Sequence, residues 1–299
     1  MPNWNEILTE TNGIITAPTD LIRKKYLDIL HNMTKRNIIC YYSGWLAKPN
    51  ANHISISDID MEGFMNAVRG LDCSKGLDLF LHTPGGDVAA TEAIVKYLRS
   101  KFGTDIRVFV PQLALSAGTL IACASKEIIM GNQSSLGPID PQIGGIAALD
   151  VLREYEEFEA DIIQNPYKAH YWSIRLQGVP PTFINKCKDA VSLSTELATN
   201  WLKTGMFEDE AMDTGRIDSI VGKLNEKLNS KTHGRHFDKV YCKRIGLKIV
   251  DLEDKNGFKE NVFQDVVLSI HHAYCISLTN TAAVKIIENH NGARILRFA

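Results

Sequence analysis

The most informative stretch of this sequence is residues 77–87, Leu-Asp-Leu-Phe-Leu-His-Thr-Pro-Gly-Gly-Asp. They begin with a short apolar run typical of a buried strand, and a sharp turn follows before a helical pattern over 89–102. A second strand is predicted over 105–110, and a small-residue helix over 116–124. Strands that alternate with helices in this way indicate a parallel sheet with right-handed crossovers.

The pattern continues on both sides of this block. The further predicted elements are a helix over 20–36, a strand over 37–45, a helix over 58–67, a strand over 127–130, a glycine-rich loop over 131–145, a helical stretch over 149–201 interrupted at 166 and 179–181, a short helix over 209–218, and helical periodicity over 262–288. The sequence therefore favours an α/β protein with additional helices after the sheet.

The composition is that of an ordinary globular protein, with 299 residues, 44% hydrophobic residues and a formal net charge of −2. This charge argues against binding to nucleic acid or to an anionic membrane surface. The six cysteines form no CxxC pair, so the zinc and thioredoxin patterns are absent. We expect no metal site and no cofactor. Cysteines within apolar runs are typical of a reducing compartment, which favours a cytoplasmic location.

Two further observations concern targeting. The N-terminus lacks a basic segment followed by an apolar run, so no signal peptide is expected. The apolar stretch 108–124 is shorter than a membrane span and is interrupted by Pro111 and Gln112, so no membrane span is expected either.

The candidate catalytic residues lie in two turns, and not in one of the common nucleotide-binding or metal-binding motifs. The sequence contains no P-loop, GxGxxG, HExxH or GxSxG motif, which argues against kinases, Rossmann oxidoreductases, zincins and α/β-hydrolases. Gly85 and Gly86 let a ligand approach the main chain closely. Ser116, one strand–helix–strand unit later, stands where a helix should begin. It is either an N-cap or a nucleophile whose neighbouring amides stabilise an oxyanion.

The motifs TPGGD (83–87), ALSAGT (114–119) and SSLGPIDPQ (134–142) resemble the ClpP-like, crotonase-fold serine peptidases. Within these, the sequence is most similar to the SppA-like group and its serine dehydrogenase proteinase family. The similarity extends to RNIICYYSGWL near the N-terminus and to the distal segments THGRHF and AAVKIIENHNG. It covers most of the chain from about residue 20.

This resemblance implies a crotonase-like spiral of ββα units with an N-terminal helix and a helical C-terminal extension. The expected organisation is a helical segment (1–36), a catalytic domain (37–222) and an extension (223–299) that packs on the core or the oligomer. A ring or other symmetric homo-oligomer acting on a peptide or protein substrate is also implied.

Carried over residue by residue, the resemblance makes Ser116 the nucleophile and gives the oxyanion hole to the backbone N–H groups of Gly86 and Ala117. We expect Gly85 and Asp140 to contact the substrate. The sequence departs from ClpP at the general base, because Asp140 stands where the resemblance implies a histidine and Lys203 stands where it implies the triad acid.

SppA-like enzymes use a Ser-Lys dyad instead, and Lys168 follows Ser116 by 52 residues. A lysine acts as a base only when its pKa is lowered, and the neighbouring Tyr167, Tyr171 and Trp172 offer apolar surroundings that would do so. Lys203 is the second candidate. His233 and His236 are the third, provided that the C-terminal segment folds back over the site.

Three functions follow from these residues. The first is a serine peptidase that forms an acyl-enzyme on Ser116. The second is a crotonase-type acyl-CoA enzyme, against which the serine at the helix start and the missing glutamate argue, and which binding of coenzyme A would reveal. The third is a catalytically inactive ClpP-like scaffold, in which Ser116 is only an N-cap.

Overall fold

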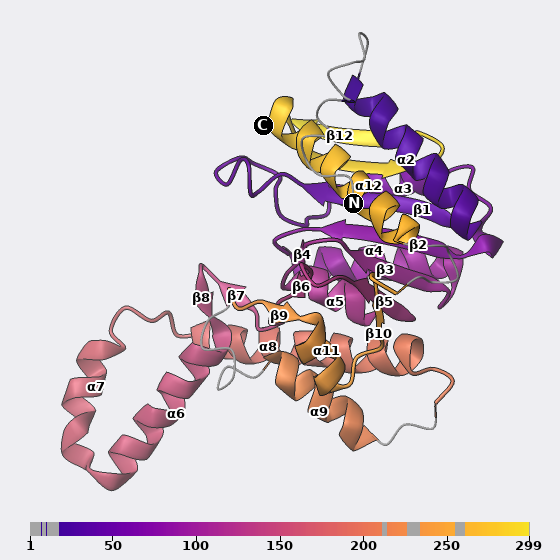
Figure 1. Ribbon diagram of the computed structural model, residues 1–299. Helices are drawn as coiled ribbons and strands as arrows, with labels where there is room; N and C mark the ends of the chain where they lie inside the picture. The colour runs from indigo at the N-terminus through magenta and orange to yellow at the C-terminus, as the bar shows by residue number, and fades with distance from the viewer. Residues whose placement is uncertain are drawn as a thin grey trace.

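The computed structural model describes residues 7, 10, 18–210, 214–225, 234–254 and 261–298. Its centre is a seven-stranded sheet in the order β10-β5-β3-β2-β1-β11-β12 (Figure 1). The strands are β10 (Ile249–Asp251), β5 (Glu127–Met130), β3 (Ile106–Val110), β2 (Leu77–His82), β1 (Asn37–Ser43), β11 (Ala283–Asn289) and β12 (Arg294–Phe298). From β10 to β1 the neighbours are parallel, whereas β11 and β12 add two antiparallel strands at the β1 edge.

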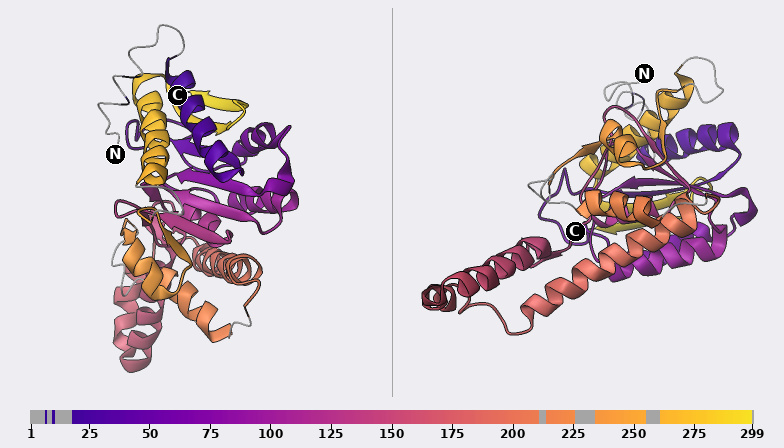
Figure 2. Two further views of the ribbon diagram at one scale, coloured as in Figure 1. Left: turned by 45° about the vertical axis from the view of Figure 1, so that its right-hand side comes forward. Right: turned by 90° about the horizontal axis from the view of Figure 1, so that it is seen from below.

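Helices cover both faces of this sheet (Figures 1 and 2). On one face lie α3 (Asp60–Val68), α4 (Val88–Phe102) and α5 (Ala117–Cys123), and on the other lie α2 (Pro18–Thr34) and α12 (Val262–Asn280). The strands serve both layers because successive side chains point to opposite faces. Along β2, Leu79 and Leu81 pack with α4 and α5, while Phe80 packs with α2 and α12. Each such buried side chain contributes about 1.5–3 kcal/mol.

Short strands frame the carboxyl end of the large sheet. A three-stranded sheet contains β4 (Leu113–Ala114), β6 (Ser135–Leu136) and β9 (Phe237–Asp238), and a hairpin joins β7 (Gln142–Ile143) to β8 (Ile146–Ala147). The bridge between Thr83 and Ala114 connects β4 to the end of β2. These pairs bring the segments after β2 and β3 to the same edge.

A helical arm extends away from the sheet (Figures 1 and 2). The arm consists of α6 (Ala148–Gln164), the 3₁₀ turn η2 (Pro166–Lys168) and α7 (Ala169–Arg175). After the arm come α8 (Phe183–Trp201), a π-helical turn η3 (Leu202–Met206), α9 (Thr214–Asn225) and α11 (Lys239–Ile245). Earlier in the sequence, a 3₁₀ turn η1 (Cys73–Lys75) precedes β2.

The predicted α/β fold class is confirmed, and the alternation of strands and helices from 37 to 130 agrees with the sequence pattern. The helix predicted over 262–288 is too long: it ends at Asn280, and Ala283–Asn289 is a strand. All seven residues of that strand are buried, so its sequence lacks the apolar–polar alternation of a half-exposed strand.

The helix predicted over 209–218 is also displaced. Residues 211–213 lie outside the described residues, and α9 runs from 214 to 225 with Gly215 near its start rather than its end. Ile217, Ile220 and Leu224 are buried in the core on one side of this helix. Their packing outweighs the low helix propensity of glycine.

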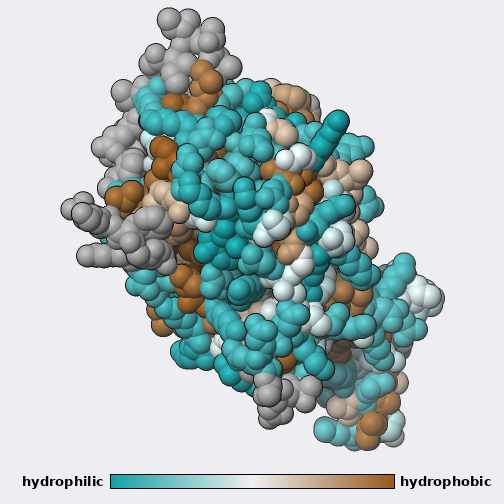
Figure 3. All heavy atoms as spheres, turned by 90° about the vertical axis from the view of Figure 1, so that its right-hand side faces the viewer, coloured by the Kyte–Doolittle hydropathy of each residue, from teal (hydrophilic) through white to brown (hydrophobic). Residues whose placement is uncertain are grey.

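The outer surface is mixed. Figure 3 shows one side of the molecule as mostly hydrophilic, with apolar side chains gathered in separate patches. Within the described part of the chain, no helix is both long and apolar enough to cross a membrane.

Candidate active site

Ser116 has an unusual backbone conformation at the start of α5. It occupies the N-cap position with φ +52° and ψ −115°, a region that non-glycine residues rarely adopt. Its side chain makes no capping hydrogen bond to the first turn of the helix, whose residues are all described. A strained backbone that leaves the hydroxyl uncommitted is typical of functional residues rather than of an ordinary N-cap serine.

The turn after β2 is hydrogen bonded to the segment that carries Ser116. The Thr83 N–H donates to the Leu113 carbonyl (3.1 Å), and the Leu115 N–H donates to the Thr83 carbonyl (3.0 Å). Gly85 has φ +100°, and a Cβ there would lie 2.7 Å from the Ser116 Cβ. Only glycine allows the two turns to approach this closely.

Two backbone amides in these turns remain available to a ligand. Gly86 forms a parallel bridge with Ile56, in which the Ile56 N–H donates to Gly85 O (2.8 Å) and the Asp87 N–H donates to Ile56 O (2.9 Å). In this pattern the Gly86 N–H points away from Ile56. Among hydrogen bonds between described residues, none uses the amide of Gly86 or of Ala117. Two such amides beside a serine hydroxyl can stabilise a developing oxyanion.

Ser116, Gly85 and Gly86 line one pocket of about 600 Å³. The remaining lining residues are Ser55, Pro84, Asp87, Val88, Ala89, Leu120, Ile139, Pro141, Gln142, Ile143, Ala190 and Leu193. Asp87 supplies the charged group, but its Oδ1 caps α4 by accepting from the Ala90 N–H (2.7 Å). No lysine, arginine or histidine stands among the described residues that line this pocket.

Asp140 lies beside the pocket rather than in its wall. It is 2% exposed, whereas its neighbours Ile139 and Pro141 line the pocket. The Gln142 side-chain amide donates to Asp140 Oδ2 (3.3 Å). Asp140 therefore supports the loop that forms this wall, and its proposed contact with substrate stays a prediction.

Lys168 lies on the arm and does not line the Ser116 pocket. Its Nζ pairs with Asp161 Oδ1 (2.6 Å), and 47% of its side chain is exposed. Hydrogen bonds from Lys168 and from the Trp172 indole lower the pKa of the Asp161 carboxyl. Of the apolar neighbours expected for Lys168, Tyr167 is 93% exposed and Tyr171 is 54% exposed, whereas Trp172 is buried and shares Asp161 with Lys168.

The other candidate bases are likewise outside the pocket lining. Lys203 is exposed on the π-helical turn η3. His236 is exposed beside Phe237 in a separate small cavity. His233 lies outside the described residues. The structure thus brings together the serine, the glycine turn and the amides, and leaves the candidate bases apart from them.

Sequence reasoning missed a buried ion pair behind the oxyanion turn. Lys285 Nζ on β11 donates to both oxygens of Asp60 (2.8 Å each) and to the Ser55 carbonyl (2.8 Å), and both side chains of the pair are fully buried. The Tyr41 hydroxyl also donates to Asp60 Oδ2 (2.8 Å). Burial lowers the pKa of Lys285, and the Asp60 carboxylate opposes that shift.

Through the Ser55 carbonyl, this ion pair holds the residue that precedes Ile56, and Ile56 forms the bridge with Gly86. A signal for it was present, because a lysine inside the apolar run Ala-Val-Lys-Ile-Ile needs a buried partner.

Fold and pocket together define an α/β protein of the ClpP-like class, with a serine and two amides at the carboxyl ends of the parallel strands of its sheet. The family of ClpP-like SDH-type serine proteinases matches residues 21–173. The chain belongs to this family.

Two proteins from Methanocaldococcus jannaschii are similar to this chain in sequence. The uncharacterized protein MJ0137 is 33% identical over 202 residues, which are 66% of this chain and 65% of that protein. The uncharacterized protein MJ1495 is 40% identical over 96 residues, 32% of each chain. The match thus spans less than two thirds of either relative.

Among solved structures, a mutant of the membrane-bound stomatin-specific protease 1510-N is similar at 16% identity with a TM-score of 0.38. That alignment covers 69% of this chain and 83% of the other.

Proposed function

We propose that this protein is a serine peptidase in which the Ser116 hydroxyl is the nucleophile. Its Oγ attacks the peptide carbonyl, a base takes the hydroxyl proton, and the amides of Gly86 and Ala117 hold the oxyanion. The amine then leaves with that proton, and water hydrolyses the acyl-enzyme. The main support is the geometry of Ser116, which has a strained backbone and a side chain that makes no capping hydrogen bond. It lines a pocket of about 600 Å³ beside two amides that form no hydrogen bond with described residues.

We propose Lys168 as the base, with Lys203 as the alternative. Within one chain Lys168 is paired with Asp161. To act as the base, Lys168 must leave Asp161, and the arm must bring it to a Ser116 pocket. A lysine that leaves a carboxylate and enters an apolar pocket has a lower pKa, which is the property a base requires.

The exposed apolar side chains near the end of the arm support its contact with another surface. Ile163 is 81% exposed, Tyr167 is 93% exposed and Ile174 is 60% exposed. Clusters of this kind mark sites of protein association. We therefore propose a homo-oligomer in which the arm of one copy packs against a neighbouring copy.

We also propose a cytoplasmic location. The six cysteines are all unpaired, which is typical of proteins in reducing compartments.

The test is intact mass after treatment with a fluorophosphonate, followed by peptide mapping. The proposal predicts one adduct on Ser116 that is lost in Ser116→Ala. Ser55→Ala is the matched control, because Ser55 lines the same pocket and should keep the adduct on Ser116. Labelling at neither serine, or equal labelling in Ser116→Ala, would contradict the proposal.

An inactive ClpP-like scaffold is the second candidate. One observation favours it: the described residues that line the pocket include no lysine or histidine. Hydrolysis of an unfolded protein substrate by the parent chain, and its loss in Ser116→Ala, would exclude this candidate.

A further inference from the structure

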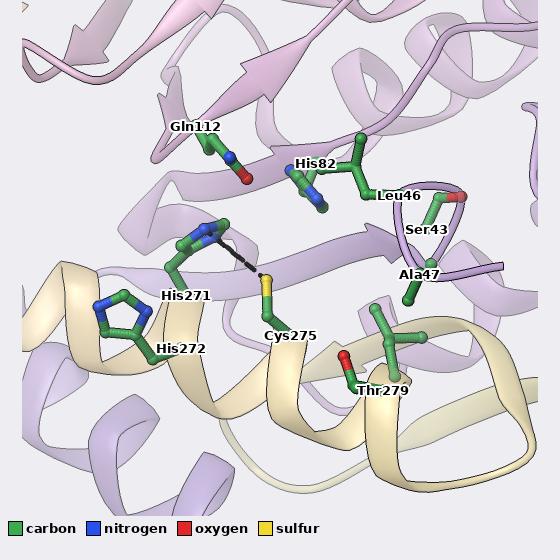
Figure 4. Close-up of a pocket in the computed structure, with 11 residues that line it drawn as sticks. Ser43, Leu46, Ala47, His82, Gln112, His271, His272, Cys275 and Thr279 are labelled. Carbon is green, nitrogen blue, oxygen red and sulfur yellow. Dashed lines mark hydrogen bonds between the residues drawn. The ribbon is translucent and has the colours of Figure 1, made fainter. Parts of the chain in front are cut away.

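A second cavity of about 450 Å³ lies between α12 and the carboxyl ends of β1 and β2 (Figure 4). Its walls include His82 at the end of β2, Gln112 just before β4, and His271 and Cys275 on one face of α12. We call it the His82 cavity. No described residue lines both this cavity and the Ser116 pocket, so the two are separate sites.

His82 gives the cavity an unsatisfied polar group. The residue is 2% exposed, and its Nδ1 is buried with no hydrogen-bond partner among the described residues. Its ring is held between Trp45 and Tyr42, with centroid distances of 4.3 and 5.5 Å. The ring also meets that of His271 edge-on, with a centroid distance of 5.2 Å (Figure 4). Buried polar groups are nearly always paired, so this nitrogen points to a missing partner.

The lining carries no formal charge at neutral pH. Apart from histidines, no ionised side chain stands among the described residues around the cavity. Burial lowers the pKa of His82 to about 3, and it also lowers the pKa values of His271 and His272. A charged ligand would lose its hydration here without gaining an opposite charge.

The rest of the lining suits an apolar body rather than a metal ion. Leu46, Ala47 and Leu278 supply aliphatic surface. Burial raises the pKa of the Cys275 thiol to about 12, so it is protonated, and its Sγ lies 3.7 Å from His271 Nε2. Within the described residues, no three His, Cys, Asp or Glu side chains are arranged to hold a metal ion.

We propose that the His82 cavity binds a neutral, mainly apolar small molecule that carries one hydroxyl or amide group. That group hydrogen bonds to the His82 imidazole, and the apolar body packs against Leu46 and Leu278. A hydroxyl or amide can donate or accept, so it satisfies the imidazole in either tautomer. The cavity has the volume and the mostly apolar lining of small-molecule sites in general. This assignment is independent of the reaction at Ser116.

Cys275 allows a site-specific test by disulfide exchange. Three disulfide probes share one linker and one phenyl ring, and differ in a carboxamide, a carboxylate or an aminomethyl group. Because a thiol with a raised pKa exchanges slowly, the protein is kept at pH 9 with each probe and increasing β-mercaptoethanol until the amount of adduct no longer changes. The adduct on Cys275 is then measured by intact mass and peptide mapping. We expect the carboxamide adduct to withstand about tenfold more reductant than either charged probe, equivalent to about 1.4 kcal/mol.

Three variants complete the design. Cys275→Ser should remove the adduct and serves as the control for reaction at other cysteines. His82→Phe keeps an aromatic ring between Trp45 and Tyr42 and should abolish the advantage of the carboxamide. Ala47→Trp changes an exposed residue on the rim and should block all three probes, with folding checked by circular dichroism. Equal retention of the three probes by the parent protein would overturn the proposal, as would an unchanged carboxamide advantage in His82→Phe.

Discussion

The turns around Ser116 and the arm that carries Lys168 contribute the two halves of the proposed catalytic apparatus, and they are held in opposite ways. Backbone hydrogen bonds between Thr83 and residues 113 and 115 fix the Ser116 turn against its neighbour. On the arm, Lys168 is half exposed and Tyr167 is almost fully exposed. The geometry at Ser116 is therefore a property of the folded chain, whereas the environment of Lys168 depends on what the arm meets.

The largest expected effect concerns the base, and it tests whether the arm supplies a group that acts on Ser116. Lys168→Ala should slow fluorophosphonate labelling of Ser116 by about 10²–10⁴-fold, the usual contribution of a general base. The measurement is the rate of adduct formation by mass spectrometry on the assembled protein.

Lys203→Ala is the matched control, since Lys203 is a second exposed lysine outside the pocket lining. Its labelling rate should stay close to that of the parent. A loss in Lys203→Ala alone would transfer the role to that residue, and no loss in either variant would exclude both Lys168 and Lys203 as the base.

The second effect tests how tightly the two turns are packed. In Gly85→Ala the new Cβ would lie 2.7 Å from the Ser116 Cβ and 2.8 Å from the Leu115 carbonyl oxygen, at a φ of +100°. We expect the free energy of unfolding to fall by about 2–4 kcal/mol, together with loss of labelling. Urea denaturation measures the first quantity.

Gly103→Ala separates backbone strain from steric contact in that experiment. Gly103 has φ +61°, but a Cβ there would meet nothing within 4 Å. Its cost should be about 1–2 kcal/mol, with labelling retained. Equal destabilisation by the two substitutions would show that the turns are not closely packed.

The third effect is a pH dependence of the free energy of unfolding, caused by His82 at the end of β2. The pKa of His82 is lowered by burial to about 3 from an ordinary 6.5. Below pH 6.5 the unfolded chain takes up a proton at this residue while the folded chain does not, so stability is lost as the pH falls. Between pH 7 and pH 5 this amounts to about 2 kcal/mol.

His82→Phe should therefore reduce the loss of unfolding free energy between pH 7 and pH 5, as measured by urea denaturation at both values. His170→Phe replaces an exposed histidine on the arm and should leave the pH dependence as in the parent. The same pH dependence in the parent and in His82→Phe would contradict the burial of a neutral imidazole.

The smallest effect on protomer stability is expected on the arm. Ile163→Ser and Tyr167→Ser change exposed side chains, so the free energy of unfolding of a protomer should change by no more than about 0.5 kcal/mol. Analytical ultracentrifugation should nevertheless show smaller assemblies. Met65→Ser, an exposed apolar residue on α3, is the control that should leave assembly intact. Unchanged assembly in both arm variants would separate the arm from oligomerisation.

Features set by local sequence patterns could be predicted from the sequence, whereas features set by contacts between distant residues could not. Regular alternation of strands and helices predicted the sheet from β1 to β5 and placed Gly85 and Ser116 at one edge, because neighbouring parallel strands end together. It did not predict β11, since a strand buried on both faces has no period of two. The unpartnered nitrogen of His82 and the pairing of Lys285 with Asp60 depend on residues far apart in the sequence. The domain limits at 36 and 222 stay predictions.

The central claim is that Ser116 and two backbone amides form one reactive site within a single folded chain. The most direct measurement is a crystal structure of the protein after reaction with diisopropyl fluorophosphate. We predict phosphorus bonded to Ser116 Oγ, with the phosphoryl oxygen about 2.7–3.1 Å from the amide nitrogens of both Gly86 and Ala117. A phosphoryl oxygen directed away from both amides, or an adduct on another residue, would contradict the account.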